Sequence, residues 1–177
     1  MKLTPAALLD RLAQAGITVT THHHAPVFTV AESQALRGQL PGGHCKSLFL
    51  RDKTGRYWLA VMLEHRRISV NALARALDAP RMSFATPEEL MALLGVIPGA
   101  VTPFGLVNDT GHQVTPVLDA EMLRHDPLHY HPLDNTMTTA ISPQGLLDFI
   151  KGCGHAPRIL PFDPLDAGPP PDVQATT

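Results

Sequence analysis

The segment from residue 45 to residue 63 constrains the fold most, because it combines two strong strand patterns with a tight turn. Residues 45–51 (CKSLFLR) and 57–63 (YWLAVML) are short, largely apolar runs of the kind that forms strands. The tetrapeptide Asp52-Lys-Thr-Gly55 between them predicts a hairpin turn. A sheet that contains this antiparallel pair is therefore expected.

Helical signals alternate irregularly with further strand signals along the chain. Capping residues and apolar stripes predict helices at 4–16, 29–37, 69–77, 86–94, 121–124 and 142–151. Apolar or alternating runs predict strands at 17–22, 81–85, 104–108, 114–118, 128–131 and 136–141. This order favours an α/β (α+β) fold, in which a mixed, mostly antiparallel sheet or partial barrel is flanked by helices. It argues against a doubly wound parallel sheet.

The length of 177 residues suits one domain that can bury a sizeable core. Hydrophobic residues make up 44% and charged residues 17%, which excludes a chain that is disordered throughout. The last 21 residues contain six prolines, so a disordered tail is predicted beyond about Phe162. We accordingly assign residues 1–160 to one domain and residues 161–177 to a proline-rich tail.

The compartment is inferred from cysteine usage and from the apolar runs. Cys45 and Cys153 are too few for a disulfide framework or a four-thiolate zinc site, which fits a reducing environment. No apolar run approaches the roughly 18 residues that span a bilayer. Asp10 and Arg11 interrupt the N-terminal stretch where a signal peptide would be apolar. We expect a cytoplasmic protein with no membrane partner.

The charge is unevenly distributed, although the formal net charge is only −2. Residues 44–81 contain eight basic and three acidic residues, a net charge of +5, so the rest of the chain carries −7. The basic residues are Lys46, Arg51, Lys53, Arg56, Arg66, Arg67, Arg75 and Arg81. Such a segment can meet a phosphate backbone. An ordinary solvated surface explains the composition equally well.

Lys46 is the first candidate functional residue. In a strand it lies on the same side as Leu48 and Leu50, so its ammonium can point into a cavity and hold a phosphate or a carbonyl. The alternative is a lysine that reaches out to water from a strand end, which is the commoner behaviour of such a residue.

Two other stretches gather polar or irregular backbone. Within residues 130–138, His131 can donate a hydrogen bond or exchange a proton near neutral pH, and Asn135 offers both donor and acceptor groups. A turn that caps itself explains this stretch equally well. The loop from Gly99 to Pro103 leaves backbone groups free to contact a ligand, but by itself it is a weak signal.

Ten histidines raise the possibility of a metal enzyme. His22 and His24 would share one strand face, as would His129 and His131. However, no His-Glu-x-x-His or Cys-x-x-Cys motif is present, so we expect no metal and no cofactor. Cys45 and His44 are adjacent in a strand and point to opposite faces, which excludes them as a catalytic pair.

Four stretches in this order carry a resemblance to a known family: 24–29 (HAPVFT), 46–52 (KSLFLRD), 98–109 (PGAVTPFGLVND) and 131–136 (HPLDNT). The chain resembles the free-standing prolyl-tRNA editing domains, which are relatives of the insertion domain of bacterial prolyl-tRNA synthetase and of the YbaK-type deacylases. The resemblance covers roughly residues 4–152. It implies a YbaK-like fold and hydrolysis of the ester between a wrong amino acid and tRNA(Pro).

The form of the third stretch is most similar to the branch that clears Ala-tRNA(Pro). The resemblance makes Lys46 the expected functional residue and Gly99 to Pro103 the lining of the aminoacyl pocket, and it places His131 in the matching motif. Ser47 departs from the asparagine that often follows this lysine, which leaves the amino-acid specificity open.

An aminoacyl ester is already activated, so positioning the ester and a water can suffice for hydrolysis. We assign Lys46 and His131 as catalytic residues. The expected substrate-binding residues are Ser47, Gly99, Ala100, Val101, Thr102, Pro103, Phe104, Asn135 and Thr136. The expected partners are the acceptor end of tRNA(Pro) and, as a second candidate, prolyl-tRNA synthetase. The main alternative is a non-catalytic module that binds aminoacyl-tRNA or partners the synthetase; a third is a histidine-rich metal enzyme.

Overall fold

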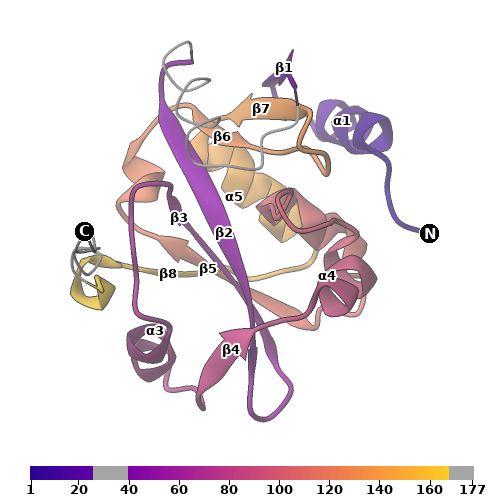
Figure 1. The fold of residues 1–177 in the computed structure, drawn as a ribbon. Coiled ribbons are helices and arrows are strands. Elements are labelled where there is room, and N and C mark those ends of the chain that lie inside the picture. The colour runs from indigo at the N-terminus through magenta and orange to yellow at the C-terminus, as the bar shows by residue number, and fades with distance from the viewer. Residues whose placement is uncertain (26–39, 168–177) are drawn as a thin grey trace, which may run out of the picture.

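The computed structural model describes residues 1–25 and 40–167, and its sheet is built around the predicted hairpin (Figure 1). β2 (Gly43–Asp52) and β3 (Tyr57–Leu63) pair antiparallel, with Cys45 opposite Leu63 and Arg51 opposite Tyr57. The turn between them is closed by the Asp52 carboxylate, which accepts hydrogen bonds from the backbone N–H and the hydroxyl of Thr54 at 2.8 and 2.6 Å. The predicted strands and turn are confirmed.

In the described part of the chain, eight strands form one open, mixed sheet with the order β1-β7-β6-β2-β3-β5-β8, and β4 pairs with β2 outside this path. The remaining strands are β1 (Val19–His23), β4 (Met82–Phe84), β5 (Val114–Asp119), β6 (Leu128–Tyr130), β7 (Met137–Ile141) and β8 (Arg158–Leu160). Four of the strand pairings are antiparallel, and the pairs β2–β6, β3–β5 and β5–β8 are parallel. The mixed, mostly antiparallel sheet is confirmed, in its open form.

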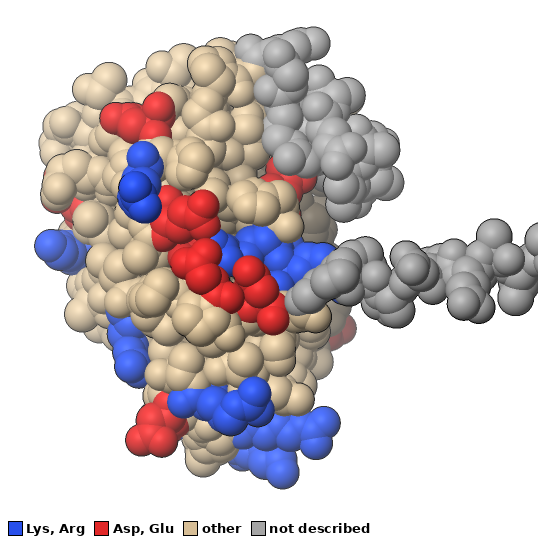
Figure 2. Space-filling view, turned by 90° about the vertical axis from the view of Figure 1, so that its left-hand side faces the viewer, with Lys and Arg blue, Asp and Glu red and all other residues tan. Residues whose placement is uncertain are grey.

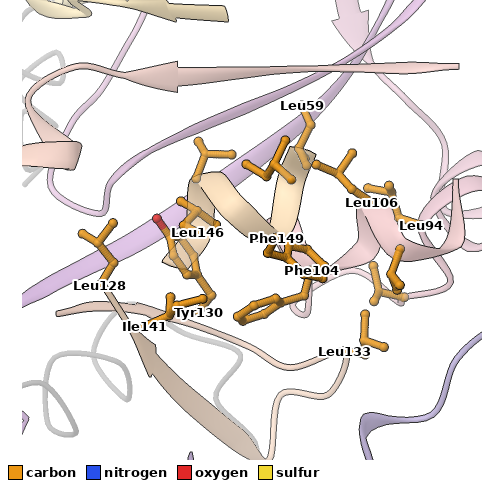
Figure 3. Packing of buried hydrophobic residues seen from close by; sticks show 14 of the residues in the cluster. Leu59, Leu94, Phe104, Leu106, Leu128, Tyr130, Leu133, Ile141, Leu146 and Phe149 are labelled. Carbon is orange, nitrogen blue, oxygen red and sulfur yellow. The ribbon is translucent and has the colours of Figure 1, made fainter. Parts of the chain in front are cut away.

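Side-chain alternation along β2 and β3 divides the interior into two cores, one on each face of the sheet. The first core receives Phe49, Leu59, Val61 and Leu63, and the second receives Leu50, Trp58, Ala60 and Met62. The helices α1 (Pro5–Gln14), α4 (Pro87–Leu94) and α5 (Pro143–Gly152) cover the first core, which Figure 3 shows in part. The second core is covered by α3 (Val70–Ala76) and by the C-terminal η3 (Asp163–Leu165).

Each of these four α-helices starts where its capping residue predicts. The side chains of Thr4, Ser69, Thr86 and Ser142 each accept a hydrogen bond from a backbone N–H in the first turn. Thr86 and Glu89 form a reciprocal capping box, with bonds of 2.8 and 3.1 Å. These helix starts are determined by local sequence, and the sequence therefore predicts them well.

The prediction of a strand at residues 104–108 is wrong. Residues Pro103–Asn108 form a buried 3₁₀-helix, η1. The Thr102 hydroxyl accepts the N–H of Phe104 at 3.2 Å, and the following proline has the backbone angle that a helix start requires. Phe104 then packs edge-on against Tyr130 and Phe149, with ring centroids 6.0 and 5.3 Å apart. This segment fills the first core and is not part of the sheet.

The prediction of disorder beyond about Phe162 is wrong for residues 163–167. Phe162 is fully buried and Leu165 is 4% exposed, both in the second core. The Phe162 N–H also donates to the buried Asp119 carboxylate at 3.1 Å. Two large apolar side chains therefore hold a proline-containing segment in place. A boundary at residue 160 stays a prediction, and the helix predicted at 29–37 lies outside the described residues.

Candidate functional site

Lys46 lies in the first half of β2, directly opposite Met62 of β3. This register places it on the face of the sheet that carries the second core, where its side chain is half-buried. Within residues 1–25 and 40–167, its ammonium makes no hydrogen bond and no ion pair shorter than 4 Å. Half-burial agrees with both interpretations of Lys46, because a lysine that reaches for solvent also buries its aliphatic stem, so its assignment as a functional residue stays a prediction.

The charges around Lys46 come from the end of β3. Burial lowers the pKa of the Lys46 ammonium, Glu64 raises it, and Arg67 lowers it. Glu64 is fixed beside the strand because its backbone N–H donates to the His44 carbonyl at 2.8 Å. The carboxylate of Glu64 therefore favours the charged form of Lys46.

His131 follows β6 and has a defined proton position. Its Nδ1 lies 2.9 Å from the Met137 carbonyl oxygen, which can only accept, so Nδ1 carries the proton in the neutral ring. Burial lowers the pKa of His131 and His24 lowers it further, whereas the Met137 carbonyl, Asp134 and Glu64 raise it. The neutral ring keeps a lone pair on Nε2, which can accept a hydrogen bond.

Glu64 is the residue that connects the two predicted catalytic side chains. It interacts electrostatically with Lys46 and also with His131. The parallel pairing of β2 with β6 brings the starts of the two strands side by side, with His44 beside His129, and Lys46 and His131 each follow this pair by two residues. The structure thus groups Lys46, His131 and Glu64 in one region.

The turn that carries His131 is rigidly constructed. The Leu133 N–H donates to the His131 carbonyl at 3.0 Å, and Leu133 adopts a left-handed conformation with φ of 68°. Burial of Leu133 in the first core holds it there. Asp134 accepts hydrogen bonds from the N–H and the hydroxyl of Thr136 at 2.7 and 2.5 Å. The self-capped turn is therefore present, although Asn135 is not one of its capping groups.

Two predicted substrate-binding side chains are buried with unused hydrogen-bonding groups. Asn135 is 6% exposed, and its Nδ2 has no hydrogen-bond partner among the described residues. The Ser47 hydroxyl oxygen is likewise buried without a partner. Leaving a buried polar group unpaired costs about 1–3 kcal/mol, so such groups are unusual unless a ligand or water uses them.

The Gly99–Pro103 loop is placed differently from Lys46. Gly99 has a φ of 89° and is exposed, whereas Ala100, Thr102, Pro103 and the following Phe104 are buried. Ala100 and Phe104 belong to the first core, on the opposite face of the sheet from Lys46, and Val101 packs against it. In the described part of the chain, no hydrogen bond joins this loop to Lys46, so its role as pocket lining stays a prediction.

The sequence matches a family model for the aminoacyl-tRNA editing domain over residues 24–149. The chain belongs to this family. The prolyl-tRNA synthetase associated domain-containing protein 1 of Bos taurus is 39% identical to this editing domain over 163 residues, which is 89% of this chain and 95% of the relative. The prolyl-tRNA editing protein ProX of Acetoanaerobium sticklandii is 31% identical over 150 residues, 84% of this chain and 92% of that one.

Solved structures show the same fold as this editing domain. A candidate trans-editing enzyme for prolyl-tRNA synthetase superposes with a TM-score of 0.70 at 20% identity, covering 95% of this chain and all of that one. A hypothetical protein, APE2540, gives a TM-score of 0.69 at 22% identity over 86% of this chain and 97% of its own. The resemblance noted in the sequence is thus confirmed for family and fold.

Sequence reasoning did not assign three residues near the editing-domain site, namely His24, Thr138 and Glu64. His24 lies with its Nε2 2.7 Å from the Thr138 hydroxyl, and its ring centroid is 6.3 Å from that of His131. Glu64 is the third, as described above. His24 opens the first of the four matching stretches, which was a usable signal; Glu64 and Thr138 depend on strand pairing that the sequence does not reveal.

Two other histidines of the editing domain form hydrogen bonds to backbone carbonyls. The rings of His44 and His129 stack with centroids 4.6 Å apart, and their Nε2 atoms lie 2.8 and 2.7 Å from the carbonyls of Leu40 and Pro41. Burial lowers the pKa of His129, which favours its neutral form. In residues 1–25 and 40–167, no three histidine, cysteine or acidic residues are grouped to hold a metal ion. No helix in these ranges is long and apolar enough to cross a membrane.

The basic segment is only partly available to a partner. Arg66 is 5% exposed and engaged with acidic side chains, and Arg51 and Arg56 pair with Glu89 and Asp52. A hollow of about 390 Å³ at the hairpin end is lined by Arg51, Asp52, Lys53, Arg81, Met82 and Ser83. Figure 2 shows several blue side chains, with a red one beside them, at the lower end of the molecule; other blue side chains lie along the left edge and beside the row of acidic residues.

Proposed function

We propose that this editing domain hydrolyses the aminoacyl ester of mischarged tRNA(Pro), with Ala-tRNA(Pro) as its substrate. The observation that carries the proposal is the half-buried ammonium of Lys46, which forms no ion pair within residues 1–25 and 40–167 and shares the charged neighbour Glu64 with His131. The printed names of the ProX relative and of the trans-editing structural neighbour support a prolyl-tRNA substrate. The form of residues 98–109 supports alanine as the amino acid.

Lys46 has the chemistry to hold the negative charge of the substrate. Its ammonium binds the phosphate of the terminal adenosine or the carbonyl oxygen of the ester, where negative charge develops during attack. Because Lys46 is half-buried, this interaction is stronger than it would be in bulk water. An activated ester requires no stronger electrophile, so the chain's own residues suffice.

His131 orients a hydroxyl or a water by accepting its hydrogen bond at Nε2. The water oxygen bonds to the ester carbon, the bond from that carbon to the ribose oxygen breaks, and a proton from the water ends on the ribose oxygen. The products are free alanine and tRNA(Pro). Within the described residues the buried Nδ2 of Asn135 has no hydrogen-bond partner, so it can hold the substrate in this geometry, whereas Ser47 follows Lys46 in β2 and its hydroxyl points to the other face of the sheet.

Selection against proline follows from size. A pocket that fits a methyl group excludes a larger ring far more strongly than it attracts one extra methylene. We keep the Gly99–Pro103 loop as the lining of this pocket, as the family resemblance implies, with Val101 as its partly exposed side chain and Thr136 on the opposite side; Thr102 and Phe104 are buried beneath it. Correctly charged Pro-tRNA(Pro) is then spared.

The acceptor stem binds at the hairpin end of β2. Lys46 and Arg51 are five residues apart in this strand, which corresponds to about 17 Å. The single-stranded 3′ end of a tRNA can cover such a distance, which leaves the stem phosphates beside Arg51, Lys53 and Arg81. Prolyl-tRNA synthetase is the further partner we propose, as the source of mischarged tRNA.

The test is a hydrolysis assay on purified Ala-, Cys-, Ser- and Pro-tRNA(Pro), with Lys46→Ala and Lys151→Ala compared. Lys151 is exposed in the last turn of α5, so it is a matched lysine outside the site. We expect hydrolysis of Ala-tRNA(Pro), its loss in Lys46→Ala and its retention in Lys151→Ala. Tight binding of Ala-tRNA(Pro) without turnover would instead identify a non-catalytic binding module, and full activity of Lys46→Ala would exclude our assignment.

A further inference from the structure

The residues after β8 hold the connection between β3 and α3. The Ser69 N–H donates to the Leu165 carbonyl and the Ala167 N–H donates to the Arg67 carbonyl, both at 2.8 Å. Ile68 also forms an isolated antiparallel bridge with Asp166. The backbone of the C-terminal segment is therefore bonded to the backbone of residues 67–69.

Arg66, in the same connection, joins the C-terminal segment through its side chain. Its guanidinium ion-pairs with four carboxylates: Asp119 at 2.8 Å, Asp163 at 3.1 Å, Asp166 at 2.9 Å, and Glu121. We call this group the Arg66 cluster. Two of its carboxylates come from the β5 end and two from residues 163–166, so one buried arginine ties both to the end of β3. Figure 2 shows acidic side chains lying around basic ones beside the start of the grey C-terminal atoms.

The two residues that flank this arginine region act on Lys46. Glu64 and Arg67 are the charged groups whose electrostatic interactions with the Lys46 ammonium are resolved. Glu64 leaves β3 two residues before Arg66, and Arg67 follows it directly. The Arg66 N–H also donates to the Leu63 carbonyl at 3.1 Å, which keeps this connection tightly turned. Glu64 and Arg67 thus belong to the short connection that the Arg66 side chain anchors.

We propose that residues 163–167 are a positioning element for Lys46: through the Arg66 cluster they fix Glu64 and Arg67 relative to its ammonium. An effect of this positioning on catalysis rests on the proposed function. The effect of residues 163–167 on the surroundings of Lys46 does not. Arg66, Asp163 and Asp166 are positioning residues, since they act on Lys46 through the connection.

The experiment uses the full chain with Asp163→Asn/Asp166→Asn, which removes two carboxylates from the cluster. The matched control is Asp10→Asn/Asp78→Asn, because both residues are exposed, make no ion pair within the described residues and give the same change in net charge. The single variant Asp163→Asn, in which the replaced side chain is 68% exposed, guards against a fold defect in the double variant. The readouts are the NMR titration of the Lys46 side chain and the kcat and KM for Ala-tRNA(Pro).

We expect the pKa of Lys46 to shift in the double variant, because Glu64, which raises it, and Arg67, which lowers it, are no longer held in their places beside the ammonium. We expect kcat to fall roughly tenfold while KM changes less than about twofold, since small displacements of a catalytic group are costly. The control should match the wild type in both readouts. An unchanged Lys46 titration, in a variant whose melting temperature alone has fallen, overturns the proposal. If no mischarged tRNA(Pro) is hydrolysed by the wild type, the proposed function fails, and the Lys46 titration still decides the positioning claim.

Discussion

Two cations at the same end of the sheet have opposite environments. Arg66, just after β3, is almost fully buried and ion-pairs with four carboxylates. Lys46, opposite the last part of β3, is half-buried and ion-pairs with none of the described residues. Both lie in the same basic segment of the sequence, so the segment's charge does not distinguish them.

The difference shows how the surroundings of a cation distinguish one that stabilises the fold from one that can bind a ligand. A buried charge that only holds the fold together must have its counter-charges supplied by the protein. A charge that binds a passing anion must keep its binding capacity unused until the anion arrives. This contrast predicts that replacing Arg66 lowers mainly the stability of the protein, whereas replacing Lys46 lowers mainly its activity.

The largest effect is expected for Arg66→Met, which removes the guanidinium while keeping an unbranched apolar stem. Asp119 has no exposed side-chain surface, so its carboxylate would be left buried without a counter-charge. Breaking one side of such a pair typically costs about 3–5 kcal/mol. Urea denaturation of the wild type and the variant measures this difference. A loss below about 1 kcal/mol would show that solvent, and not Arg66, compensates these acids.

Lys46→Met should give the reverse result. Its free energy of unfolding should change by less than about 0.5 kcal/mol, the usual range for sites without such features. Turnover of Ala-tRNA(Pro) should fall roughly 10²–10³-fold, as for loss of one group that stabilises an oxyanion. Denaturation and single-turnover kinetics on the same preparation check both. A variant that loses stability and activity in proportion would remove the contrast with Arg66.

The parts that the sequence predicts correctly are those set by near neighbours in the chain. The β2–β3 hairpin depends on a turn of four residues, and the helix starts depend on a capping side chain and the first turn. The prediction of a strand at 104–108 was wrong because Thr102 and Pro103 start a helical turn. The apolar run that follows them resembles a strand, and this pattern was given more weight than the helix start. Element type is thus decided by short patterns, and errors arise where two patterns compete.

The parts that the sequence does not reveal depend on distant partners. Arg66 finds its carboxylates 55, 97 and 100 residues away at Glu121, Asp163 and Asp166. Composition assigned the last two to a tail expected to be disordered. In the site, Lys46 and His131 could be proposed from motifs, but Glu64 joins them only because β2 pairs with both β3 and β6.

Asp52 extends the comparison to a buried anion that, like Arg66, has its partners supplied by the protein. Burial alone would raise the pKa of Asp52, but hydrogen bonds from Thr54, Trp58 and Arg56 lower it to about 2. Because the folded pKa lies below the unfolded one, the carboxylate stabilises the protein fully above about pH 4. This stability is lost as pH falls through about 2.

Asp52→Asn should therefore cost about 2 kcal/mol at pH 7, since one pKa unit corresponds to about 1.4 kcal/mol. The difference from the wild type should shrink between about pH 4 and pH 2. Unfolding free energies measured across this pH range test it. A difference that is constant with pH would mean that the shape of the turn, and not the charge of Asp52, is what stabilises the hairpin.

The smallest effect is expected for Arg81→Ala. Like Lys46, Arg81 forms no ion pair with the described residues, but its side chain is exposed. Arg81 lines the hollow at the hairpin end. If it contacts one acceptor-stem phosphate, its loss should weaken tRNA binding several-fold and reduce the slope of log affinity against log salt by roughly one. Stability should be unchanged, since no described residue bonds to the Arg81 side chain and alanine keeps the backbone carbonyl that accepts the Lys53 N–H. The matched control is Arg124→Ala, an exposed arginine outside the basic segment that should leave the salt dependence as it is. Equal salt slopes for Arg81→Ala and the wild type would show that the acceptor stem does not bind beside Arg81.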